Sequence, residues 1–145
     1  MTLSTFGAIM GFAAQIVGQT EESYKASVQK AKGPALREAL QGLLQEEGKN
    51  RSLMEQIRRE NVTEMILEPV TGLNQEDYGM NVKMQEGALD ADILKMVISL
   101  EAREKKFFQE ASVKVPLPEV SRAFRKIAQR KEKNILKLNS IGPTQ

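Results

Sequence analysis

The chain has 145 residues, of which 28% are charged and 41% hydrophobic, as is typical of one soluble globular domain. It contains no cysteine and no histidine. This excludes disulfides, thiolate chemistry, serine–histidine catalysis and imidazole metal ligands, so that any metal would need oxygen ligands alone. The net charge of +2 does not by itself indicate nucleic acid or a membrane surface as a partner.

The first predicted helix spans residues 4–31, in which apolar side chains recur at three- and four-residue steps. Its stripe comprises Phe6, Met10, Ala13, Val17, Tyr24 and Val28. The apolar run over residues 6–18 is too short to span a bilayer and follows no Lys or Arg, so we expect a cytoplasmic protein without a membrane anchor. Gly33 and Pro34 predict a turn, because proline is tolerated in the first turn of the next helix.

The second predicted helix extends to residue 60 and completes a first helix pair over residues 4–60. Residues 61–89 contain Pro69 and several glycines and show little periodicity, which predicts a crossover, with a short helix expected near residues 62–67. A second helix pair follows over residues 90–139, with Asp90 as its predicted N-cap.

The chain matches itself when it is shifted by 84 positions. Identical pairs include Pro34 and Pro118, Ala39 and Ala123, Gln45 and Gln129, Lys49 and Lys133, and Asn50 and Asn134, and similar pairs include Met10 and Leu94, Tyr24 and Phe108, Leu43 and Ile127, and Met54 and Leu138. Most matches fall at positions that would face a core. We therefore predict a single all-α domain over residues 1–145, a four-helix bundle built from two helix-pair pseudo-repeats with a long crossover between helices 2 and 3.

Polar residues interrupt the apolar stripes at one level of the predicted bundle. They are Glu47 and Asn50 on the second helix, Glu101 and Glu104 on the third, and Lys131 and Asn134 on the fourth. Burial of such groups is costly unless they are paired or hydrogen-bonded. We therefore expect a polar core network that also includes the Tyr24 hydroxyl.

These positions resemble the diiron site of rubrerythrin-type members of the ferritin-like superfamily. In that family the first and third helices carry a glutamate seven residues before an aromatic, and the second and fourth carry Glu-x-x-His. Glu101 stands seven residues before Phe108 and fits the third helix, with Glu104 as an additional acid. Glu47 fits the second helix, but Asn50 stands where the resemblance requires histidine.

The other family positions have lost their ligands. Val17 stands seven residues before Tyr24, and Lys131-x-x-Asn134 replaces the Glu-x-x-His of the fourth helix. The resemblance therefore implies a ferritin-like bundle in which most diiron ligands are substituted. We expect Lys131 to pair with Glu47 and Glu101, while Asn50 and Asn134 satisfy the remaining hydrogen bonds.

Two functions follow as expectations. The first is a non-catalytic ferritin-like bundle that acts through protein–protein contacts, with no catalytic residue and no cofactor. The alternative is a degenerate rubrerythrin-like metal-binding protein or oxidoreductase, in which Glu47, Glu101 and Glu104 hold iron or another divalent metal through oxygen ligands.

Two surfaces bear on partners. The outer side of the fourth helix carries Arg122, Lys126, Arg130, Lys133 and Lys137. This pattern is typical either of a solvated surface, neutralised by the acidic crossover or by a neighbouring subunit, or of a site for an acidic partner. The lack of interleaved aromatics argues against nucleic acid. Apolar residues also lie outside the core stripe of the first helix, at Leu3, Ile9, Phe12 and Ile16. They predict contact with the crossover or, as our leading expectation, a homodimer.

Overall fold

Four long α-helices make up most of the structure, a computed structural model that describes residues 2–61, 72–79 and 87–141. The helices are α1 (Phe6–Lys30), α2 (Pro34–Glu60), α3 (Asp90–Ser112) and α4 (Pro118–Ile141), with a short 3-10 helix, η2 (Gln75–Tyr78), between α2 and α3. The all-α class and the four predicted helices are confirmed. The short helix expected near residues 62–67 lies outside the described residues.

The helix ends follow local side-chain chemistry. α1 begins at Phe6 rather than at residue 4, because the Thr5 hydroxyl accepts a hydrogen bond from the Ala8 N–H at 3.0 Å and caps the helix. Pro34 is the first residue of α2, as the sequence predicts. α4 continues to Ile141, two residues beyond the predicted end.

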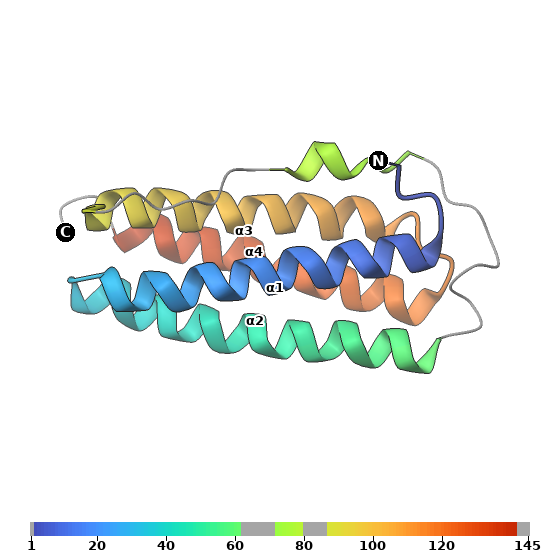
Figure 1. Cartoon of the computed structure of the whole chain (residues 1–145), viewed down its shortest axis with the longest axis horizontal. Helices are drawn as coiled ribbons and strands as arrows, with labels where there is room; N and C mark the ends of the chain where they lie inside the picture. The colour runs from blue at the N-terminus through green and yellow to red at the C-terminus, as the bar shows by residue number, and fades with distance from the viewer. Residues whose placement is uncertain (1, 62–71, 80–86, 142–145) are drawn as a thin grey trace.

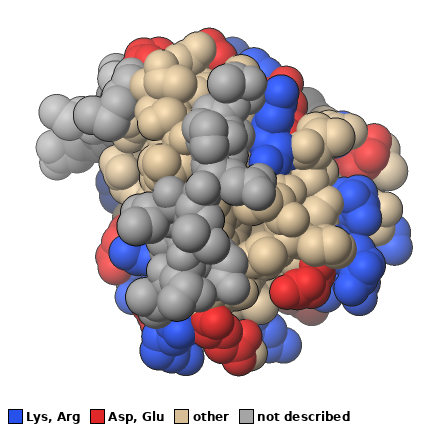
Figure 2. All heavy atoms as spheres, turned by 90° about the vertical axis from the view of Figure 1, so that its right-hand side faces the viewer, with Lys and Arg blue, Asp and Glu red and all other residues tan. Residues whose placement is uncertain are grey.

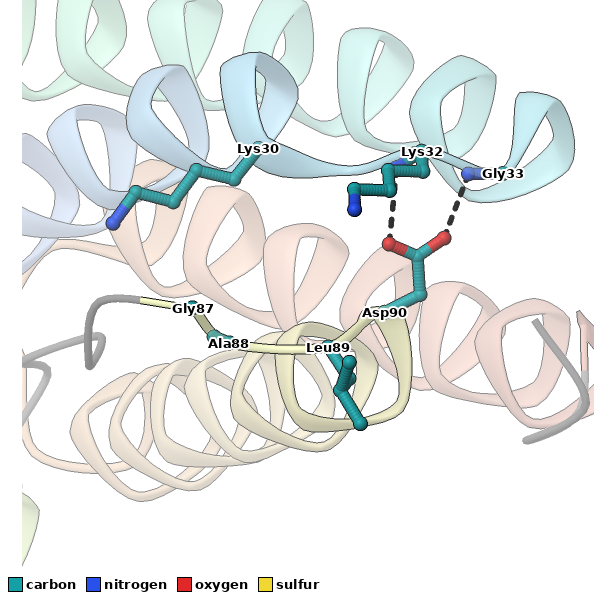
Figure 3. A pocket seen from close by; sticks show the side chains of 7 residues that line it. All are labelled: Lys30, Lys32, Gly33, Gly87, Ala88, Leu89 and Asp90. Carbon is teal, nitrogen blue, oxygen red and sulfur yellow. Dashed lines mark hydrogen bonds between the residues drawn. The ribbon is translucent and has the colours of Figure 1, made fainter.

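The prediction that Asp90 is the N-cap of α3 is wrong. Asp90 is the first helical residue, and its carboxylate instead accepts hydrogen bonds from the backbone N–H groups of Lys32 and Gly33, at 3.0 and 2.7 Å (Figure 3). These two donors lie in the turn between α1 and α2. Asp90 therefore ties the first helix pair to the start of the second.

The helices pack as a bundle in which α1 lies against α2 and α3 against α4, with further contacts between α1 and α3 and between α2 and α4 (Figure 1). α2 ends at the end of the bundle opposite to the one where α3 begins. A long connection between the second and third helices is therefore required, as the sequence predicts.

The core has two apolar parts, one toward each end of the bundle. The first contains an aromatic group, Phe12, Tyr78, Phe107, Phe108 and Phe124. Phe108 lies edge-on to Phe107 and to Phe124, with ring centroids 5.1 and 5.0 Å apart. The second part is mainly aliphatic and comprises residues such as Leu36, Leu40, Ile93, Val97 and Leu138. On α2, α3 and α4, buried charged side chains separate the two parts.

The apolar residues outside the core stripe of α1 are buried within this chain. Leu3, Ile9, Phe12 and Ile16 all belong to the first part of the core. Phe12 packs against Tyr78 of η2 and Phe107 of α3, with ring centroids 6.0 and 5.3 Å away. The crossover thus covers this side of α1, and these residues no longer indicate a second subunit.

The surface of the described residues carries charges of both signs. Seen from the end where α2 ends and α4 begins, acidic and basic side chains occur side by side around the rim (Figure 2). None of the helices in the described part of the chain has the length and apolar character needed to cross a membrane.

Replacing Asp90 by alanine should lower the free energy of unfolding by about 1–2 kcal/mol at neutral pH, because the backbone N–H groups of Lys32 and Gly33 lose the carboxylate that accepts their hydrogen bonds. The backbone hydrogen bonds from Lys32 and Gly33 hold the pKa of Asp90 below its ordinary value. Its contribution is therefore complete above the unfolded pKa and is lost as the pH falls through the lowered folded pKa. Urea unfolding at pH 7 and pH 3 checks this, because an equal loss at both values would contradict a role for the charge.

Candidate functional site

A charged layer crosses the middle of the bundle between the two apolar parts of the core. It contains Glu47 from α2, Glu101 and Glu104 from α3, and Lys131 from α4, and all four side chains are fully buried. Each occupies an inward position on its helix, which continues with apolar residues above and below. The flanking apolar steps predict inward positions for these residues, because they fix the helical phase.

Lys131 is the centre of the layer. Its ammonium group donates hydrogen bonds to Glu47 Oε1 and, at 2.9 Å, to Glu101 Oε2, and it lies 3.6 Å from Glu104 Oε1. Burial would lower the pKa of Lys131, but the three carboxylates outweigh it and hold that pKa well above the ordinary value. Lys131 therefore stays protonated at neutral pH.

Glu101 accepts three hydrogen bonds, one from α1 and two from α4. Its donors are the Tyr24 hydroxyl at 2.5 Å, the Lys131 ammonium at 2.9 Å and the Asn134 amide at 2.9 Å. Burial, followed by the nearby carboxylates, raises the pKa of Tyr24 well above its ordinary value, so the phenol remains a neutral donor. Glu101 thus joins α1, α3 and α4.

The two asparagines complete the network predicted from the sequence. Asn50 donates to Glu47 Oε1 at 3.0 Å within α2. Asn134 is half-buried and donates to Glu101 and also, at 2.8 Å, to Glu46 Oε1. Sequence reasoning missed Glu46, because helical periodicity does not tell which neighbouring helix faces the flank of α2.

Some buried carboxylate oxygens have no donor. Glu47 Oε2 and both oxygens of Glu104 accept no hydrogen bond among the described residues. Burial and the charge of Glu104 raise the pKa of Glu47 well above its ordinary value, although Lys131 acts in the opposite direction. Glu47 therefore takes up a proton more readily than an exposed glutamate does.

The α1 side of the layer is different from the other three. Val17, at the position where the resemblance requires a glutamate, is buried among apolar residues. The polar contacts of α1 here are made by Thr20, which accepts from Arg103 at 3.2 Å, and Glu21, which accepts from Arg51 at 2.6 Å. Neither pair was predicted, since both depend on which helices lie side by side.

The donor set does not fit a metal ion. The atom that lies among the three carboxylates is the Lys131 nitrogen, which carries a positive charge and offers no lone pair to a cation. Across residues 2–61, 72–79 and 87–141, no group of three or more acidic side chains is arranged so that it could hold a metal. The ammonium group and a dication would repel each other at this position.

Comparisons with models of protein families, with curated proteins and with solved structures gave no match for this chain.

Proposed function

We propose that this protein is a non-catalytic, ferritin-like bundle that acts through protein–protein contacts, with the ammonium group of Lys131 in the place of a metal. The observation that carries the proposal is the complete burial of Lys131 among Glu47, Glu101 and Glu104. The internal repeat supports it as well. Glu47 and Lys131 occupy equivalent positions in the two helix pairs, 84 residues apart, and they bond to each other.

The chemistry of the layer argues against catalysis by its own side chains. A buried lysine that stays protonated cannot serve as a nucleophile or a base. Tyr24 stays neutral, and its hydroxyl already donates to Glu101. The charged side chains of the layer, Glu47, Glu101, Glu104 and Lys131, are fully shielded from solvent, so no substrate reaches them without opening of the bundle.

The layer instead fixes how the helices align. A buried ion-pair network need not stabilise a fold more than an apolar core, but it penalises any register in which its partners separate. Here Lys131 of α4 must stand level with Glu47 of α2 and Glu101 of α3. One alignment of the helices is therefore favoured, and the outer surfaces that meet partners are held in a fixed arrangement.

Metal analysis tests the proposal against the metal-binding alternative, which the donor-free oxygens of Glu47 and Glu104 favour. Protein purified without chelators should contain less than stoichiometric metal, and Fe²⁺ or Mn²⁺ should leave its melting temperature unchanged. A saturating ligand would stabilise the fold by about 3 kcal/mol. Stoichiometric metal, or a clear rise in melting temperature, would overturn the proposal.

The variant Lys131→Glu provides the matched comparison, because it replaces the ammonium by a fourth carboxylate at the same place. We expect Mn²⁺ to raise the melting temperature of this variant, or to restore its folding, while the unchanged protein does not respond. If neither protein responds, the layer binds no Mn²⁺ even without its ammonium group, and this would overturn the part of the proposal that puts Lys131 in the place of a metal.

A further inference from the structure

The exposed face of α4 carries a continuous row of cations. This basic stripe consists of Arg122, Lys126, Arg130, Lys133 and Lys137, all of which are exposed. Their three- and four-residue spacing places them within an arc of about 80° and along about 22 Å of the helix. Glu119, three residues before the first of them, marks where the stripe begins.

The basic stripe has no acidic partner in the described part of the chain. Other surface cations there do form ion pairs, namely Lys25 with Glu22, Arg51 with Glu21 and Lys105 with Glu132. Like charges three or four residues apart on a helix repel each other and destabilise it. An anionic partner that neutralises such a run therefore stabilises it by removing this repulsion.

The basic stripe is only one helix wide. On its α2 side, Glu38 and Glu46 line a groove of 260 Å³ together with Lys137 and Asn134. On its α3 side, Glu132 lies 3.4 Å from Lys105. A broad anionic surface such as a membrane would bring these flanking carboxylates close to its own negative charges. A narrow, elongated partner avoids that repulsion.

The side chains beside the basic stripe also discriminate among partners. The aromatic residue of α4, Phe124, is buried in the core, so α4 offers no ring for base stacking or for anchoring in a membrane interface. Leu136 is 66% exposed and lies on the flank of the stripe, three residues after Lys133. It offers an apolar contact next to the charges.

We propose that the basic stripe of α4 docks an acidic α-helical segment of a partner protein. Carboxylates repeated every three or four residues on such a segment match the spacing of the five cations, and an apolar residue among them would cover Leu136. The inference rests on the proposed function, because it names the surface and the class of partner through which the bundle acts.

The test uses a fluorescently labelled synthetic peptide of about 20 residues, long enough to be helical, with glutamates at three- and four-residue steps and one leucine. Its affinity for the full chain is measured by anisotropy at low and at physiological salt. The stripe variant carries Lys126→Glu, Arg130→Glu and Lys133→Glu. The control variant carries Lys49→Glu, Arg58→Glu and Lys95→Glu, which change three exposed cations of α2 and α3 by the same charge.

We expect the stripe variant to bind the peptide at least about tenfold more weakly and the control variant within about threefold of the unchanged chain. Equal losses in both variants would show that net charge alone is responsible and would overturn the proposal. So would equal binding of a peptide with the same composition in scrambled order, or tighter binding to phosphatidylserine vesicles or duplex DNA. If the stripe variant does not fold, the three positions are changed to alanine with the same expected direction.

The outcomes separate this inference from the proposed function. If the protein contains no metal and does not bind the peptide, the basic stripe is not the docking surface. The proposal of a non-catalytic bundle is then unaffected. Stoichiometric metal in the unchanged protein would overturn the proposal of a non-catalytic bundle, whether or not the peptide binds.

Discussion

Replacing Lys131 by methionine should lower the free energy of unfolding by about 3–5 kcal/mol, the usual cost of breaking a buried ion pair from one side. Methionine fills a similar volume, so little of the loss comes from a cavity. It leaves the carboxylates of Glu47 and Glu101 buried without their ammonium donor. Urea unfolding at pH 7, followed by circular dichroism, measures the difference.

The control for this experiment is Lys133→Met, on the same helix but exposed to solvent. We expect it to change the free energy of unfolding by less than about 0.5 kcal/mol. A triple variant, Lys131→Met with Glu47→Gln and Glu101→Gln, removes all three charges and should recover part of the loss, since the single change leaves uncompensated charge. An effect of Lys131→Met no larger than that of Lys133→Met would contradict a central role for this lysine.

The helices and the charged layer could be predicted from the sequence because both depend on local periodicity. The apolar steps of α2 and α4 continue on both sides of Glu47 and Lys131, so a helix that buries those steps must also bury the charges. Pro34 and Pro118 each mark the first residue of a helix. The phase of each helix therefore follows from its own residues, independently of its neighbours.

Contacts between segments far apart in the chain could not be predicted in the same way. Asp90 is a typical N-cap residue, but its carboxylate is used by the turn at Lys32 and Gly33, which only the packed bundle brings near. The second apolar side of α1 predicts that another segment packs against it. Periodicity cannot tell whether this segment is a second subunit or Tyr78, which lies in a segment with little periodicity. The wrong prediction at Asp90 concerns the arrangement of the helices rather than their existence. The homodimer stays a prediction.

The network also distinguishes Glu101 from Glu104, which helical periodicity places in the same layer. Glu101 and Glu104 lie on the same helix, in the same layer, and both are fully buried. Glu101 accepts from Tyr24, Lys131 and Asn134, whereas Glu104 accepts no hydrogen bond among the described residues and lies 3.6 Å from the lysine nitrogen. The two side chains should therefore differ in what they contribute to stability.

Changing Glu101 to glutamine should lower the free energy of unfolding by about 3 kcal/mol, because the amide keeps the shape but removes the charge and presents N–H groups to donors. The matched change Glu104→Gln should cost at most about 1 kcal/mol, because no hydrogen bond is lost and the negative charge of the layer falls. Urea unfolding of both variants at pH 7 gives the comparison. Equal losses would show that the layer depends on its total charge, and not on the hydrogen bonds that converge on Glu101.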